Sequence, residues 1–188
     1  MIKRYTLRIV LLAALLTFGV QAHAQDIDSN DSEYLIKAGF IYNFAKLVDW
    51  PQSAFGQAGQ PIVIGVLGSD SFASILDHIV DGKKIDGRPL LVKRTHWNKD
   101  FSCGCHILFI TSSESLRTDE VIQGLRNASV LTIAESPGFA KRGGIINFTL
   151  EDNKVHFEVN VEAAKQAGLN ISSRLLSLAK IVQARPQR

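Results

Sequence analysis

Three polar segments contain the candidate ligand-binding residues, and each segment comes directly after an apolar run. They are residues 68–71, 111–114 and 134–139. Their hydroxyls, backbone amides and carboxylates suit a small polar ligand, and the binding candidates are Gly68, Ser69, Ser71, Thr111, Ser112 and Glu135. If the apolar runs are parallel strands, these segments meet at the carboxyl ends of the strands, where such sheets bind ligands. The set predicts a binding crevice, with no catalytic constellation, no metal and no cofactor.

The segment from Gly65 to Ser71 is open to two interpretations. Glycines before a helix let the backbone approach an anion, which the helix N-terminus attracts. The segment lacks the full glycine pattern of dinucleotide sites and the lysine of a phosphate loop. The alternative is an ordinary turn in which Ser69, Asp70 or Ser71 caps the following helix.

Cys103 and Cys105 are the two cysteines of the chain, and His106 follows them directly. Three interpretations are open. Cys105 is a small apolar residue at the start of a buried strand, or the two cysteines are bridged to each other or across a dimer, or they bind a metal together with His106. A bridge between them would close a small, strained ring, and the spacing is not a usual zinc pattern. As candidates for catalysis, the histidines of the mature chain (His78, His96, His106 and His156) are each interpreted as structural.

The N-terminus has the three parts of a secretory signal peptide. Lys3, Arg4 and Arg8 precede an uncharged apolar stretch at residues 9–20, and Ala22-His23-Ala24 fits a cleavage site. The stretch is shorter than the roughly 20 residues that a membrane-spanning helix needs. We therefore expect cleavage after Ala24 and export to the periplasm, where oxidation of cysteines is favoured.

Removal of residues 1–24 changes the charge and the size of the chain. The whole chain has a net charge of +3, and the signal contains three basic residues and no acidic one, so the mature chain is formally neutral. This balance does not indicate a nucleic-acid partner. We expect a flexible polar leader at residues 25–31 and a single domain at residues 32–188.

The mature chain alternates between strand and helix patterns. The apolar runs at residues 61–67, 90–95, 106–110 and 130–133 are typical of strands, and residues 71–80 and 118–126 have one apolar helical face. This rhythm predicts an α/β fold with a flavodoxin- or Rossmann-like, mostly parallel sheet and helices on both faces. No linker or internal repeat interrupts it.

The C-terminal part changes period. Residues 146–150 and 155–159 alternate apolar and polar side chains around the turn residues 151–154, which predicts an antiparallel hairpin. Two terminal helices are expected, one from Val161 to Ala167 and one from Ser172 to Ala184.

A helix is predicted from Ser32 to Trp50, where Pro51 stops it. Its apolar side chains cover an unusually wide arc that only Lys37 interrupts, more than a single core contact hides. One explanation is a helix buried on two sides by its own domain. The other is a dimer or partner surface, formed by Phe40, Ile41, Phe44 and Val48.

Several segments resemble the YfiR family. The most specific are the pattern Y-N-F-x-K-x-x-x-W-P at residues 42–51 and the pattern I-S-S-R-L-L at residues 171–176. Further matching segments are residues 64–68, 82–90, 105–110, 138–140 and 143–148. The resemblance covers nearly the whole mature chain.

The resemblance implies a regulatory role. A YfiR-like protein is expected to be a periplasmic dimer that represses an inner-membrane diguanylate cyclase by binding the periplasmic region of that enzyme. A small-ligand sensor without a cyclase partner is the alternative. In the best-known member of the family, redox control runs through two pairs of bridged cysteines, whereas this chain has Cys103 and Cys105 alone, so that control is not carried over.

Overall fold

The computed structural model describes residues 29–98 and 102–184 of the 188-residue chain. The predicted signal peptide, its cleavage after Ala24 and residues 25–28 of the predicted leader lie outside the described residues. Among the residues described, no helix combines the length and the apolar character that crossing a membrane requires.

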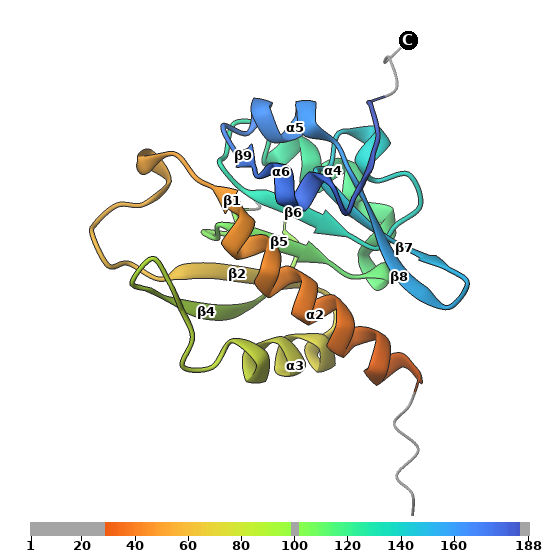
Figure 1. Ribbon diagram of the computed structural model, residues 1–188, viewed down its shortest axis with the longest axis horizontal. Coiled ribbons are helices and arrows are strands. Elements are labelled where there is room, and N and C mark those ends of the chain that lie inside the picture. The colour runs from red at the N-terminus through yellow and green to blue at the C-terminus, as the bar shows by residue number, and fades with distance from the viewer. Residues whose placement is uncertain (1–28, 99–101, 185–188) are drawn as a thin grey trace, which may run out of the picture.

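A mostly parallel sheet forms the centre of the described part of the chain, with the strand order β10-β8-β7-β6-β5-β2-β4-β3 (Figure 1). Its strands are β2 (Ile62–Leu67), β3 (Lys84–Ile85), β4 (Arg88–Thr95), β5 (Ile107–Ile110), β6 (Leu131–Ala134), β7 (Ile146–Glu151), β8 (Lys154–Val159) and β10 (Lys180–Ile181). The pairs β3–β4 and β7–β8 are antiparallel, and the other neighbours are parallel. The predicted α/β class, mostly parallel sheet and hairpin are confirmed.

The remaining elements cover the two faces and the ends of the sheet. They are α2 (Ser29–Leu47), β1 (Val48–Asp49), η1 (Gln52–Ala54), α3 (Asp70–Val80), η2 (Ser112–Arg117), α4 (Thr118–Gly124), η3 (Ala140–Arg142), α5 (Val161–Gln166), β9 (Asn170–Ile171) and α6 (Ser173–Leu176). Residues of α2 and α3 pack into one apolar cluster with β2, β5 and β6, and residues of α4 pack into a second one together with Phe139, which precedes η3. Successive strand residues alternate between the clusters, which is why these strands are apolar throughout.

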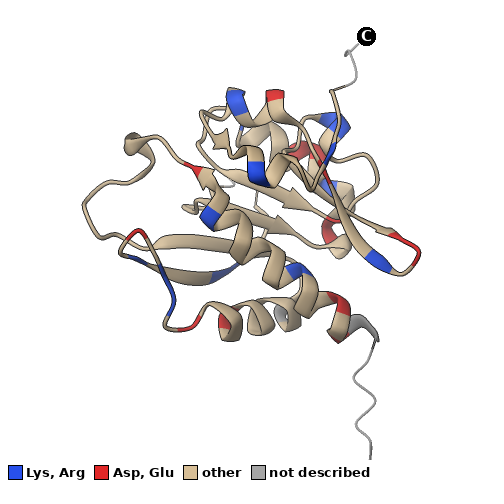
Figure 2. Cartoon of the chain, viewed as in Figure 1, with Lys and Arg blue, Asp and Glu red and all other residues tan. Residues whose placement is uncertain are grey.

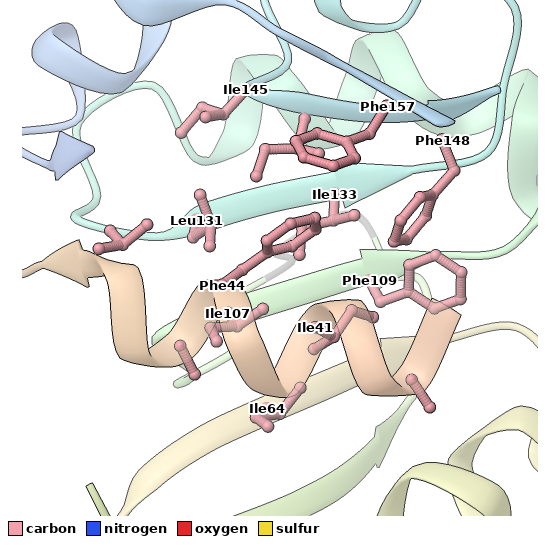
Figure 3. Packing of buried hydrophobic residues seen from close by; sticks show 14 of the residues in the cluster. Ile41, Phe44, Ile64, Ile107, Phe109, Leu131, Ile133, Ile145, Phe148 and Phe157 are labelled. Atoms are coloured by element: carbon pink, nitrogen blue, oxygen red, sulfur yellow. The ribbon is translucent and has the colours of Figure 1, made fainter. Parts of the chain in front are cut away.

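Helix α2 crosses the sheet beside α3 and is part of the core (Figures 1 and 3). Ile41 is 0% exposed and Phe44 is 2% exposed. The Phe44 ring stacks on Phe148 with ring centroids 5.9 Å apart and meets the edge of Phe157 at 5.0 Å. Aromatic contacts of this kind add to the free energy that burial itself contributes.

The predicted interface of Phe40, Ile41, Phe44 and Val48 therefore requires correction. Ile41, Phe44 and Val48 are buried in the core of their own chain, and the partly exposed Phe40 packs against that core. The wide apolar arc is explained by contacts of α2 with the sheet, with α3 and with α6. Exposed apolar side chains on this helix are Leu35 and Ile36 instead.

The bounds of helix α2 also differ from those that the sequence pattern predicts. It begins at Ser29, three residues before the predicted start, and it ends at Leu47 instead of Trp50. Val48 leaves the helix because it pairs with Ile171 in the short antiparallel sheet of β1 and β9. This pairing fixes the end of α2 next to the C-terminal segment.

The second terminal helix is much shorter than the predicted helix from Ser172 to Ala184. Helix α6 begins after Ser172, whose hydroxyl accepts a hydrogen bond from Leu175 N, and ends at Leu176. Residues 180–181 then form β10 at the edge of the sheet, parallel to β8. Although the apolar residues have helical spacing, this segment pairs with β8 instead, because the pairing provides hydrogen-bond partners for the backbone of β8.

Charged side chains of both signs are scattered over the elements (Figure 2). Neither sign gathers on a single helix or along the sheet in that view.

Candidate functional site

The three segments predicted to form a crevice do meet at the carboxyl ends of the parallel strands. Strand β2 has β4 on one side and β5 on the other, so the chain reverses its direction of winding at this point. The backbone N–H of Ser69 donates to Thr111 Oγ1 at 3.3 Å, and the N–H of Ser112 donates to Glu135 Oε1 at 2.7 Å. The fold therefore brings residues from all three segments together.

Within this cluster the polar groups are bonded to one another. Ser69 caps α3, because its side chain accepts a hydrogen bond from Phe72 N, and its hydroxyl also lies 2.8 Å from that of Ser71. Gly68 has a φ of +111°, and a Cβ there would lie 2.1 Å from Thr111 Oγ1. Of the two interpretations of this segment, the structure has the capped turn. The turn packs against residues 111–114.

Helix α2 contributes two residues that sequence reasoning did not assign to the site. Lys37 forms ion pairs with Glu135 and Glu33, and the side chains of Lys37 and Glu135 are only 6% and 7% exposed. Tyr34 lies next to them and close to Ser69. The sequence feature that could have pointed to Lys37 is its position, since it alone interrupts the apolar arc of the helix.

The charges of this cluster stabilise each other. Burial alone would lower the pKa of Lys37, but the hydrogen bonds to Glu135 and Glu33 outweigh burial and raise its pKa. Burial, together with the negative charge of Glu135, raises the pKa of Tyr34. Lys37 is therefore charged and Tyr34 neutral at physiological pH, which makes the cluster a fixed ion pair that locks α2 onto the sheet.

Cys103 and Cys105 form a disulfide within the chain, with their Cα atoms 5.1 Å apart. Of the three interpretations of these cysteines, the structure has the bridged pair. Both residues are buried in the second apolar cluster, so Cys105 also serves as a small apolar residue there. Gly104 between them has a φ of +52°, a conformation that favours glycine.

His106 is held by backbone groups at the amino ends of the strands. Val63 N–H donates to Nδ1 at 3.0 Å, and Nε2 lies 3.2 Å from the carbonyl oxygen of Ala54. This pairing requires a neutral ring with its proton on Nε2, and it leaves neither nitrogen for a metal. The ring stacks on Phe55 at 4.6 Å, which attaches residues 51–60 to the sheet. His106 is thus structural, as predicted.

The protein is expected to lose stability when the pH falls below about 6.5, the ordinary pKa of histidine. Burial lowers the pKa of His106 in the folded state. The unfolded chain therefore binds the proton at a higher pH than the folded chain does, so the free energy of unfolding decreases as the pH falls. Protonated Nδ1 would also lose the hydrogen bond from Val63.

Urea unfolding at about pH 7.5 and about pH 5.5 checks this expectation, because carboxylates remain mostly ionised over that range. His106→Gln should lose less stability over the interval than the wild type. His78→Gln, at an exposed histidine of α3, is the matched control and should behave as the wild type. An equal loss in all three proteins would show that His106 is not responsible.

Two neighbouring cavities open at the amino ends of the strands, opposite the predicted crevice. One, of about 590 Å³, has the disulfide, His106, Gln60 and Ser129 in its wall. The other, of about 560 Å³, lies between α4, η3 and α5. Leu125 and Val130 line both. Sequence reasoning missed these cavities because side chains from distant segments form their walls.

Comparison with models of protein families gives a match. A family model described as YfiR/HmsC-like matches residues 34–180, which include nearly all of the residues that form the sheet and its helices. No curated protein matches the chain.

Proposed function

Because the chain belongs to the YfiR/HmsC-like family, we propose that it is a periplasmic binding protein that represses an inner-membrane diguanylate cyclase. By holding that enzyme inactive it would lower cyclic di-GMP signalling. The observation that carries the proposal is the family match over residues 34–180. The signal-peptide pattern of residues 1–24 supports the periplasmic location.

The chemistry of the described residues supports binding over catalysis. Glu135 is neutralised by Lys37, and Thr111 bonds to neighbouring backbone groups. His106 uses both ring nitrogens on the backbone. A general acid or base must reach the proton that it transfers, and these groups are occupied by their own chain.

The C-terminal segment is our candidate surface for the cyclase. Leu178 is 69% exposed and Ile181 is 52% exposed, and β10 is an edge strand, with no strand of the described residues paired to its outer side. Exposed apolar residues on a sheet edge are a common docking feature. This surface replaces the buried residues of α2 as the proposed interface, both for the cyclase and for a homodimer.

Co-purification tests the proposal. The tagged full chain should recover a membrane diguanylate cyclase from detergent-solubilised membranes. The double substitution Leu178→Asp and Ile181→Asp should lower this recovery by about tenfold or more, as loss of an interface centre does. Leu116→Asp is the control, because Leu116 is 96% exposed on η2.

The outcomes separate two claims. Failure of the wild-type chain to recover a diguanylate cyclase would contradict the proposed function. Equal recovery by the wild type and the double variant would support the proposed function and show that the interface lies elsewhere on the protein.

A small-ligand sensor without a cyclase partner is the second candidate. The two cavities favour it, because both volumes lie in the range of small-molecule sites. A stabilising ligand in a thermal-shift screen, combined with unchanged cyclic di-GMP in cells that lack the protein, would select this alternative.

A further inference from the structure

The cavity between α4, η3 and α5 has the composition of a binding site for an organic anion. Its volume is about 560 Å³. Its buried lining is apolar apart from Thr132, and its charged and amide side chains are more exposed. The apolar lining residues include Ile122, Leu125, Val130, Ile145, Ala163 and Ala167. An apolar hollow with a few charged groups is the usual form of a small-molecule site.

Small residues keep the hollow open. Ala163 and Ala167 of the α5 segment and Gly143 at the end of η3 line it. A Cβ at Gly143 would approach Ile122 to 3.6 Å, so the missing side chain leaves room between these elements. Larger side chains at these positions would fill the space that a ligand would occupy.

The charges around the cavity are unbalanced. Arg142 is already engaged, since it forms an ion pair with Asp119 at 2.7 Å and donates to Thr118 Oγ1 at 3.0 Å. Asp119 is the acidic residue of the lining, and this pair neutralises it. Arg126 and Lys141 also line the cavity, and neither forms an ion pair with another described residue. Two cations therefore face the cavity without a described counter-charge.

We propose that this cavity binds a small amphipathic anion, with an apolar body on the floor and a carboxylate, sulfonate or phosphate held by Arg126 and Lys141. Arginine offers such groups a planar fork of donors, and lysine adds a flexible point charge. The amides of Gln123 and Gln166 at the rim can donate further hydrogen bonds. The inference is independent of the cyclase partner.

Two fluorescent probes of similar shape test the inference on the full mature chain. Anilinonaphthalene sulfonate carries a negative charge, and N-phenylnaphthylamine is its neutral counterpart. The wild type should bind the sulfonate at one site per chain. The double substitution Arg126→Gln and Lys141→Gln should weaken sulfonate binding about tenfold and change binding of the neutral probe less than about twofold.

Two further variants complete the test. Ala163→Leu narrows the cavity and should weaken both probes. Lys84→Gln with Lys154→Gln removes two exposed cations that do not line the cavity, so both probes should bind as they do to the wild type. The inference is overturned if the charge variant binds the sulfonate like the wild type, if both charge pairs matter equally, or if Ala163→Leu changes neither probe.

Discussion

Lys37→Met is expected to lower the free energy of unfolding by about 3–5 kcal/mol, the usual effect of removing one partner from a buried ion pair. The substitution leaves Glu135 at 7% side-chain exposure without its cation. The backbone N–H of Ser112 would be the remaining donor to that carboxylate. Since a domain is typically stable by only about 5–15 kcal/mol, this loss would be severe.

Urea unfolding near neutral pH measures the effect. Lys46→Met is the matched control, because Lys46 lies on the same helix and is exposed. It should cost less than about 1 kcal/mol. Combining Lys37→Met with Glu135→Leu should recover much of the stability, because no charge is then left buried. If Lys37→Met and Lys46→Met have the same effect, the ion pair does not lock α2 onto the sheet.

Phe44→Ala is expected to lower the free energy of unfolding by about 3–5 kcal/mol, as for other large core residues. Phe44 is 2% exposed and contacts the rings of Phe148 and Phe157. Its removal opens a cavity between α2 and the sheet. Because these contacts lie within one chain, the loss should not depend on protein concentration.

The concentration dependence is the informative part of this experiment. If Phe44 lay at a dimer interface, the difference in stability between the wild type and Phe44→Ala would shrink on dilution, because both proteins would then be monomers, whereas the effect of a core residue persists at every protein concentration. Ile36→Ala is the control on the same helix, at a residue that is 48% exposed, and should cost less than about 1 kcal/mol. A loss that disappears in dilute Phe44→Ala protein would restore the interface interpretation.

The parallel sheet could be predicted from sequence because its signal is local. The apolar runs that become β2, β5 and β6 are buried on both faces, and such burial leaves a continuous apolar pattern. The hairpin could be predicted for the same reason. Its turn residues Asp152 and Asn153 have positive φ values of 50° and 57°, which these residue types tolerate well.

The helix ends that could not be predicted from the sequence are determined by pairing between strands that lie far apart along the chain. Val48 and Lys180 fit a helical pattern, but each pairs with a strand that is distant in sequence. The polar residues of the predicted crevice do meet at the carboxyl ends of the strands, where they bond to one another. Its closure by Lys37 depends on where α2 crosses, and that position follows from packing.

The central claim is that the chain represses a diguanylate cyclase from the periplasm. The most direct measurement is the cellular concentration of cyclic di-GMP in wild-type cells, in cells with the gene deleted, and in deleted cells that express the chain with or without residues 1–24. We predict a rise after deletion that the exported chain reverses and the chain without residues 1–24 does not. An unchanged cyclic di-GMP concentration after deletion would contradict the claim.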